Sequence, residues 1–224
     1  TIILVKNTIG GNDTFDFAMT GAGLPSGTQL TTVGNTASTT FSNLDPDNTY
    51  SIAETPIPAG WDLISSSCTG TNTPGSITPD AGEVITCTFT NEEDANIIVI
   101  KQTDPDGDPT SFEFNPSYAS NFFLSDGQSN DSGDLAPGTY SVSEIVPAGW
   151  DLTSATCTDG TPASISLQAG ETVTCTFNNQ KDAFIIVDKV TDPAGDPTLF
   201  DFTTDYGSPF SLAAATTPNN SGDL

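Results

Sequence analysis

The sequence predicts an all-β protein made of tandem Greek-key β-sandwiches stacked end to end. Three observations support this fold class. Landmarks recur at intervals of about 90 residues, the apolar residues fall in short segments bounded by turn residues, and no segment has a capped apolar period of about 3.6 residues. We therefore expect almost no helix.

The expected strands of the second repeat are rich in β-branched or aromatic residues, and turn residues such as Asp106-Gly107 and Pro137-Gly138 separate them. In chain order these strands are Ile97–Gln102, Ser111–Asn115, Asn121–Leu124, Gly138–Ile145, Asp151–Cys157, Ala163–Leu167 and Glu171–Asn179. Strands of this number and length in one repeat are typical of a Greek-key sandwich. We expect the first repeat to follow the same order.

An apolar strand that ends in lysine marks the start of each repeat. It occurs as Ile2–Lys6, Ile97–Lys101 and Ile185–Lys189. The chain therefore divides into a first repeat over residues 1–95, a second over 96–183 and an incomplete third over 184–224. Because half a sandwich leaves its sheet face and edges open, we expect that the chain continues or that a neighbouring chain completes the third unit. The joins between repeats are too short for a flexible linker, so the repeats should form a rod.

The charge of the chain excludes several classes of function. There are 29 acidic residues against 4 lysines, with no Arg or His, and the formal net charge is -25. Nucleic-acid binding needs a basic patch, and an anionic membrane surface would repel this chain. Without His, neither a Ser-His-Asp nor a Cys-His site can be built. No apolar run is long enough to cross a bilayer. We therefore expect no enzyme, no nucleic-acid partner and no direct membrane insertion.

The four cysteines occupy repeated positions, with one pair in each full repeat. Cys68 and Cys87 return as Cys157 and Cys175, with no CxxC motif. An even count at repeated positions, in a chain without His, favours disulfides over a zinc site. Buried free thiols are the alternative. Disulfides indicate an oxidising setting outside the cell.

An acidic loop follows the lysine strand of the second repeat. Asp104, Asp106 and Asp108 alternate along this loop, and alternating carboxylates can converge on one hard cation. The pattern predicts a calcium ion as the one candidate cofactor, although the loop is not an EF-hand. The alternative is a solvated turn with Asp-Gly and Asp-Pro chemistry.

Two further features lie outside these motifs. Asn-x-Ser/Thr sequons at Asn12, Asn130 and Asn219 are candidate glycosylation sites, and the last two occupy what we expect to be the same surface loop of successive repeats. Trp61 and Trp150 each follow Pro-Ala-Gly and offer a sugar-stacking platform. Single aromatic residues at a repeated position more often pack in a core or between repeats, and we favour packing.

The order of landmarks in each full repeat resembles a known family. A strand that ends in Lys is followed by a Tyr-x-x-x-Glu strand, by Pro-Ala-Gly-Trp, and by a last strand that ends in Asn. This order is similar to that of the Cna B-type, or SpaA-like prealbumin-fold, domains of bacterial surface proteins and pilins. The resemblance implies a transthyretin-like β-sandwich. It also implies a spontaneous isopeptide bond between the first-strand Lys and the last-strand Asn, assisted by the Glu.

The resemblance assigns this chemistry to one set of three residues in each full repeat: Lys6, Glu54 and Asn91 in the first, and Lys101, Glu144 and Asn179 in the second. Burial would lower the pKa of the amine and keep the carboxyl neutral, so that it can polarise the amide. The alternative is that each Lys is solvated at a strand end, each Glu pairs with it weakly and each Asn is a turn residue. The disulfides could also replace the isopeptide bond as the covalent link of each repeat.

These observations favour a structural protein at the cell surface or outside the cell. We expect a fibre, a pilus-like filament or a stalk, whose partners are other copies of the chain or neighbouring repeats of the same protein. The alternative is an adhesin in which these repeats are spacers or ligand-binding modules. An adhesin should have one divergent repeat with an exposed apolar patch, and the first repeat is the most divergent.

Overall fold

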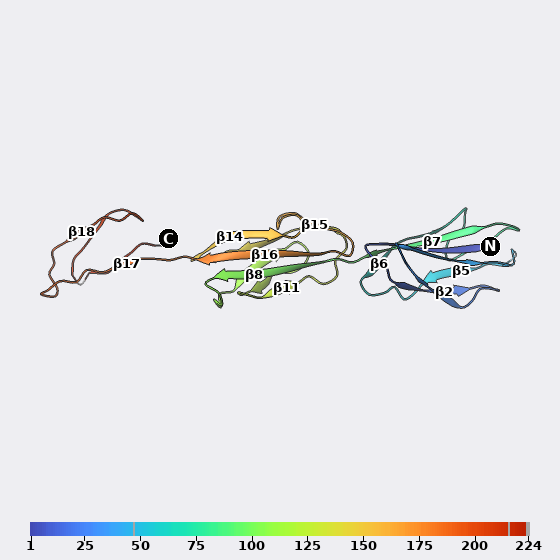
Figure 1. Cartoon of the computed structure of the whole chain (residues 1–224), viewed down its shortest axis with the longest axis horizontal. Helices are drawn as coiled ribbons and strands as arrows, with labels where there is room; N and C mark the ends of the chain where they lie inside the picture. Colours follow the sequence, from blue (N-terminus) through green and yellow to red (C-terminus); the bar gives the residue numbers. More distant parts are fainter. Residues whose placement is uncertain (47, 215, 223–224) are drawn as a thin grey trace.

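The computed structural model describes residues 1–46, 48–214 and 216–222. Its regular structure is β-strand throughout, and among these residues no helix has the length and hydropathy needed to cross a membrane. Figure 1 shows the repeats in line along the long axis, with two sandwiches and a third, more open segment at the C-terminal end. The predicted all-β fold and the end-to-end arrangement are thus confirmed.

The first repeat contains seven strands in two facing sheets. These are β1 (Ile2–Ile9), β2 (Thr14–Thr20), β3 (Gly27–Thr31), β4 (Thr36–Phe41), β5 (Ser51–Glu54), β6 (Trp61–Cys68) and β7 (Ile85–Glu93). One sheet has the order β4-β1-β7-β6 and the other β3-β2-β5. The first and last strands, β1 and β7, are parallel neighbours, whereas the other pairs are antiparallel.

The second repeat follows the same plan. Its strands are β8 (Asn96–Asp104), β9 (Phe112–Pro116), β10 (Phe122–Leu124), β11 (Ser129–Asp131), β12 (Gly138–Tyr140), β13 (Val142–Ile145), β14 (Trp150–Cys157), β15 (Ile165–Leu167) and β16 (Thr172–Lys181). The main sheets have the orders β11-β8-β16-β14 and β10-β9-β13, and β12 pairs with β15. Here too the first and last strands, β8 and β16, are parallel.

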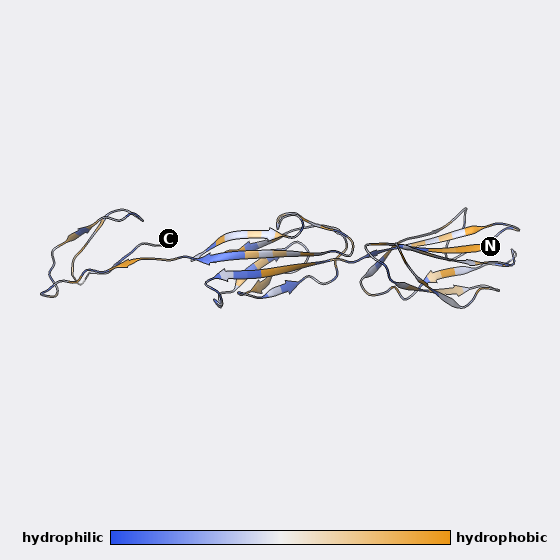
Figure 2. Ribbon diagram, in the orientation of Figure 1, coloured by the Kyte–Doolittle hydropathy of each residue, from blue (hydrophilic) through white to orange (hydrophobic). Residues whose placement is uncertain are grey.

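Strict alternation along the strands builds each core. In β1 the side chains of Ile2, Leu4 and Lys6 point inward and are fully buried, so the lysine continues an apolar row. Aromatic side chains from both sheets meet between the layers, with the rings of Phe17 and Phe89 5.2 Å apart. Figure 2 shows that hydrophobic residues concentrate on strands such as β1, while the end of β16 is hydrophilic.

Two sequence predictions about strands need correction. The segment Gly138–Ile145 is two strands in different sheets, because β12 pairs with β15 and β13 pairs with β9. At the break, Ser141 accepts a hydrogen bond from the Ser117 amide and its own amide donates to the Ser117 hydroxyl. Strand β11, which pairs with β8, was not predicted, since its three polar residues carry no apolar alternation.

The third segment buries little of its apolar surface. Its strands β17 (Ile186–Val187) and β20 (Asn219–Asn220) pair with each other, as do β18 (Phe200–Phe202) and β19 (Phe210–Leu212). The Ile185 side chain is 43% exposed, whereas its counterpart Ile97 in the second repeat is 0% exposed. This open state is what half a sandwich should have, because it has no facing sheet to cover its apolar side.

Candidate cross-link site

The first repeat brings Lys6, Glu54 and Asn91 together from three strands. Lys6 lies opposite Phe89 in the parallel β1–β7 pair, so its side chain reaches diagonally to Asn91, two residues further along β7. The Lys6 amine donates to Asn91 Oδ1, and Asn91 Nδ2 donates to Glu54 Oε1 over 2.6 Å. Lys6 Nζ lies 3.3 Å from Glu54 Oε2. Lys6 and Asn91 are fully buried, and Glu54 is nearly so.

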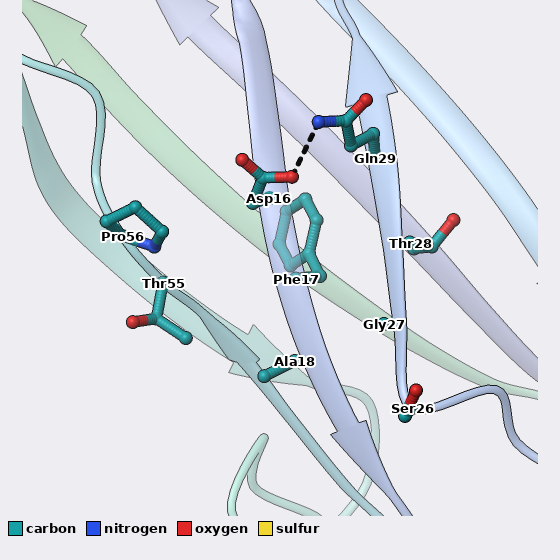
Figure 3. A pocket seen from close by; sticks show the side chains of 9 residues that line it. All are labelled: Asp16, Phe17, Ala18, Ser26, Gly27, Thr28, Gln29, Thr55 and Pro56. Atoms are coloured by element: carbon teal, nitrogen blue, oxygen red, sulfur yellow. Dashed lines mark hydrogen bonds between the residues drawn. The ribbon is translucent and has the colours of Figure 1, made fainter.

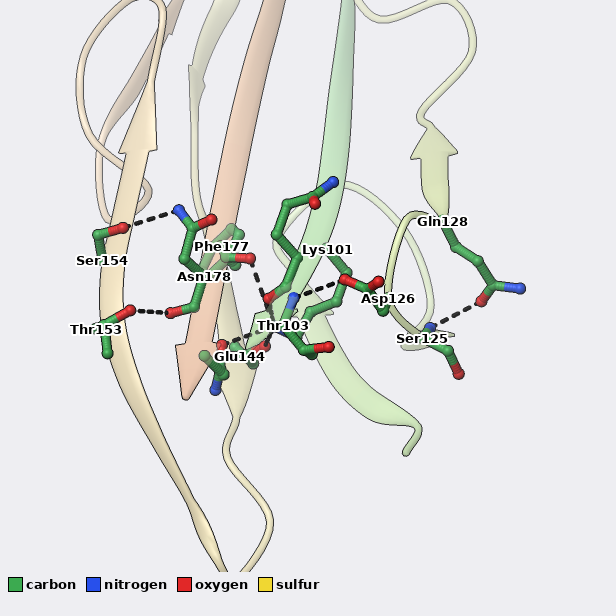
Figure 4. Close-up of polar contacts among 12 residues, drawn as sticks. Lys101, Thr103, Ser125, Asp126, Gln128, Glu144, Thr153, Ser154, Phe177 and Asn178 are labelled. Atoms are coloured by element: carbon green, nitrogen blue, oxygen red, sulfur yellow. Dashed lines mark hydrogen bonds and ion pairs between the residues drawn. The ribbon is translucent and has the colours of Figure 1, made fainter. Parts of the chain in front are cut away.

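The second repeat brings Lys101, Glu144 and Asn179 together from the corresponding strands β8, β13 and β16. Lys101 Nζ donates to Asn179 Oδ1 over 2.7 Å and lies 3.5 Å from Glu144 Oε1. Figure 4 shows Lys101 reaching toward Glu144 and toward the main chain of β16. The Lys101 and Glu144 side chains are 0% exposed. The arrangement therefore excludes the alternative of solvated lysines and turn asparagines.

Hydrogen bonding differs between the two sites. Lys101 also donates to the main-chain oxygens of Gln102, at 2.6 Å, and Phe177, at 3.4 Å. Neither carboxylate oxygen of Glu144 has a hydrogen-bond partner, whereas Glu54 Oε1 accepts from Asn91. The first repeat thus has the more complete chain of contacts from amine to amide to carboxyl.

An aromatic ring lies beneath each amine, which the sequence did not predict. Lys6 Nζ is 4.0 Å from the centre of the Phe15 ring, and Lys101 Nζ is 4.1 Å from that of Phe112. Each ring meets a tryptophan edge to face at 5.2 Å, Phe15 with Trp61 and Phe112 with Trp150. Both tryptophans are buried, so the expectation that they pack in the core is confirmed. The recurrence of Phe after the lysine strand was the available signal.

Burial sets the electrostatics of both sites. It lowers the pKa of Lys6 from its ordinary 10.5 to about 8, against the opposing effect of Glu54. It also lowers the pKa of Lys101, against the opposing effect of Glu144. In turn, burial raises the pKa of Glu144, although Asn179 and Lys101 act in the other direction. In the second repeat, transfer of one proton from Lys101 to Glu144 is therefore easier than it would be in water.

This arrangement can perform one reaction, and its atoms balance. A neutral Lys amine is positioned to attack Cγ of the Asn amide, so that an Nζ–Cγ bond forms and the Cγ–Nδ2 bond breaks. The neutral Glu carboxyl can donate its proton toward the leaving nitrogen and take one back from the attacking amine. Ammonia leaves, and an amide joins the first strand to the last.

Two disulfides confirm the predicted cysteine pairs. Cys68 bonds Cys87 and Cys157 bonds Cys175, and no cysteine is free. Each pair lies directly opposite in the antiparallel strands β6–β7 and β14–β16. The last strand of each sandwich, β7 or β16, is thus joined by a disulfide to the strand on one side of it. On its other side it lies beside the first strand, which carries the lysine.

The loop that was expected to bind calcium is held by other contacts. Asp108 pairs with Lys181 over 2.7 Å, and this bond, with those from Thr110, lowers the pKa of Asp108 to about 2. No group of three or more His, Cys, Asp or Glu side chains in the described ranges is arranged to hold a metal ion. The geometry therefore gives no support for a cation site formed by Asp104, Asp106 and Asp108.

The sequons are only partly in loops. Asn12 lies in an exposed loop, where its Oδ1 accepts from the Asn35 amide over 2.8 Å. Asn130 lies in β11 and Asn219 in β20, so the expectation of a surface loop was wrong for both. Glycosylation at these positions remains a prediction.

A shallow hollow lies on the outer face of the β3-β2-β5 sheet, where Figure 3 shows Asp16, Gln29 and Pro56 around its rim. Gln29 Nε2 donates to Asp16 Oδ1 over 2.8 Å, so these two side chains satisfy each other. Nothing in this hollow points to a ligand.

Comparison with known proteins identifies the repeats. The prealbumin-like fold domain family matches the chain twice, over residues 2–93 and residues 97–181. Both matched ranges lie within the expected repeats at 1–95 and 96–183, whose exact limits stay a prediction. A search of curated proteins gave no match.

Several solved structures are similar in fold. The major pilin protein (T-13) from Streptococcus pyogenes is 15% identical, with 81% of this chain and 97% of that chain covered and a TM-score of 0.37. The streptococcal ancillary pilin is 11% identical, with 99% of this chain and 86% of that chain covered and a TM-score of 0.35. A bacterial adhesin from Mobiluncus mulieris contains intramolecular disulfide, isopeptide and ester bond cross-links. It is 11% identical, with 78% of this chain and 86% of that chain covered and a TM-score of 0.34.

Proposed function

The chain belongs to the prealbumin-like fold domain family, and we propose that it is a structural rod outside the cell whose full repeats are each closed by an internal isopeptide bond. The bonds join Lys6 to Asn91 and Lys101 to Asn179. The rod serves as part of a fibre or surface stalk and assembles with other copies or with further repeats. Two disulfides favour an oxidising, extracellular location.

One observation carries this proposal. In both full repeats a lysine amine and an asparagine amide are in contact inside the core, with a carboxyl beside them. Burying a charged amine is costly, and a hydrophobic side chain would fill the same space with less penalty. Two independent occurrences of such a costly arrangement indicate a use for it, and the reaction described above is the use that these atoms fit.

The strand order explains why a cross-link at this place would strengthen a rod. The chain enters the first repeat through β1 and leaves it through β7, which runs on into β8. Because β1 and β7 are parallel neighbours, a pull on the two ends shears them past each other. A bond between Lys6 and Asn91 lies across this shear plane, so the force passes through it and the rest of the sandwich stays unloaded.

Intact mass after reduction of the disulfides tests the proposal. Each isopeptide bond removes one ammonia, so the wild-type chain should be about 34 Da lighter than its sequence. The Glu54→Gln and Glu144→Gln variants should each recover about 17 Da, because an amide cannot pass the proton. Glu113→Gln is the matched control, since the Glu113 carboxylate accepts a surface hydrogen bond from Asn121 and belongs to neither cross-link site, and it should keep the full mass loss.

The outcomes are distinct. A wild-type chain at its full sequence mass would refute the cross-links in both repeats. Recovery of mass in the Glu113→Gln control would show that the two other carboxyls have no special role.

A further inference from the structure

The join between the two full repeats contains no residue that is free to act as a hinge. Only Asp94 and Ala95 separate β7 from β8. The Asp94 amide donates to Gly60 O of the first repeat over 2.9 Å. Ala95 exchanges two main-chain hydrogen bonds of 2.8 Å with Leu135 of the second repeat and is 4% exposed. Each linker residue is thus fixed to one of the two sandwiches.

A turn of the second repeat also rests on the end of the first. We call Gln168–Glu171 the head turn, and Gly10, Gly11 and Glu93 the tail. The Gly170 amide donates to Glu93 O over 3.3 Å. A Cβ on Gly10 would lie 2.9 Å from the main-chain carbon of Ala169, and a Cβ on Gly170 would lie 2.6 Å from Glu93 Oε2. A side chain at Gly10 would therefore collide with the main chain of the second repeat and with Glu93 Cβ at 2.8 Å, whereas one at Gly170 would collide only with the end of the flexible Glu93 side chain.

The corresponding turn of the first repeat has the same shape without another repeat resting on it. Asp80–Glu83 is the corresponding turn of the first repeat, and it repeats both hydrogen bonds. The Glu83 amide donates to Asp80 O over 3.0 Å, and the Asp80 amide donates to Glu83 Oε2 over 2.8 Å. The matching bonds of the head turn measure 3.1 and 2.9 Å. Gly82 has a φ of 80°, close to the 71° of Gly170, but a Cβ on Gly82 would meet nothing within 4 Å. The turn is therefore preformed, and docking does not create it.

The tail of the second repeat has different chemistry. Counted from the strand lysine and the cross-link asparagine, Pro105, Asp106 and Lys181 stand where the first repeat has Gly10, Gly11 and Glu93. Lys181 is held by Asp108 over 2.7 Å. The second repeat thus lacks the two adjacent glycines that let the head turn approach the tail of the first repeat closely.

The joint forms against like-charge repulsion. Burial raises the pKa of the Asp94 carboxyl, and the carboxylates of Asp62, Asp134 and Glu92 raise it further. Asp62 belongs to the first repeat and Asp134 to the second, so negative groups of both sandwiches meet at the join. Main-chain hydrogen bonds and close glycine packing must outweigh this repulsion for the joint to stay closed.

We propose that the head turn Gln168–Glu171 and the tail Gly10, Gly11 and Glu93 form a docking interface that holds the first two repeats as one rigid body. The partner that this tail fits is a following repeat with a preformed Ala-Gly turn. The interface is independent of the isopeptide bonds, because none of its residues belongs to either cross-link site.

A distance distribution between the two repeats tests the interface. Spin labels on noncanonical residues at Ala22, exposed in the connection between β2 and β3 at the end of the first repeat away from the joint, and at Phe123, which is 60% exposed, avoid the disulfide cysteines. The wild-type chain should give one narrow distance peak. Gly10→Ala should lose that peak for a broad distribution. Gly82→Ala, the matched control with the same kind of backbone strain, should keep it.

A second variant keeps the test valid if Gly10→Ala does not fold. The double variant Gly11→Asp, Glu93→Lys carries residues that the second repeat has at its own tail, and it should also give a broad distribution. A broad distribution in the wild-type chain would overturn the proposal. A peak in folded Gly10→Ala or in the double variant that is as narrow as that of the wild type would also overturn it.

Discussion

Pulling a single chain by its ends should show that the isopeptide bond, and not the disulfide, carries the load. With Lys6 joined to Asn91, the force crosses from β1 to β7 at the bond, and the residues between them are bypassed. The disulfide Cys68–Cys87 lies inside that bypassed segment. It therefore bears no force while the isopeptide bond is intact, and the first repeat should not lengthen.

The Glu54→Gln variant removes the cross-link and exposes the first repeat to the force. Residues 2–93 then extend, except for those enclosed between Cys68 and Cys87, which leaves about 70 residues at ~3.4 Å each. Since the folded repeat already spans about 30 Å along β1, the expected step is roughly 200 Å. Adding a reductant opens the disulfide loop, with a sequence separation of 19, and should lengthen the step by roughly 60 Å.

Optical tweezers or atomic force microscopy resolve steps of this size. The wild-type chain is the control, and its two full repeats should give no step before the tether breaks. A step of roughly 200 Å in the wild type would refute the force path. An unchanged step of Glu54→Gln after reduction would refute the role given to the disulfide.

Two further predictions concern chemistry and stability. Because the pKa of Lys6 is lowered to about 8, the neutral amine that attacks Asn91 becomes the main form above that pH, and cross-linking in freshly folded chain should speed up as the pH rises to about 8 and then level off. Mass spectrometry over time measures this rate, and a rate that is independent of pH below about 8 would contradict attack by the neutral amine. Replacing Cys157 and Cys175 by alanine opens a loop with a separation of 18 and should lower the free energy of unfolding by ~3 kcal/mol in chemical denaturation. No change in that free energy would contradict a stabilising disulfide, and the mass loss should be unaffected.

Much of the fold follows from local signals in the sequence. Alternation places Lys6 in the same inward row as Ile2 and Leu4, and the repeat of this strand sets the limits of the sandwiches. The repeated positions of Cys157 and Cys175, with an even count of cysteines, already indicated a pair. These features depend on residues that are close in sequence or repeated, and a single chain shows both.

The features that were missed depend on contacts between distant segments. Strand β11 is short and polar, and it forms because it pairs with the edge of β8. Its own three residues therefore contain no apolar alternation that would predict a strand. Asp108 belonged to a plausible calcium loop until the fold placed Lys181 beside it. Gly10 and Gly11 carried no sequence prediction, and only the docked position of Ala169 shows why side chains are absent there.

Fragmentation of the branched peptide that joins β1 to β7 tests the central claim most directly. After reduction and digestion, a peptide around Lys6 and a peptide around Asn91 should be recovered as one species, about 17 Da lighter than their sum. Fragment ions should place the bond between the Lys6 side chain and the Asn91 side chain. Recovery of the two peptides as separate, unmodified species from folded wild-type protein would contradict the cross-link.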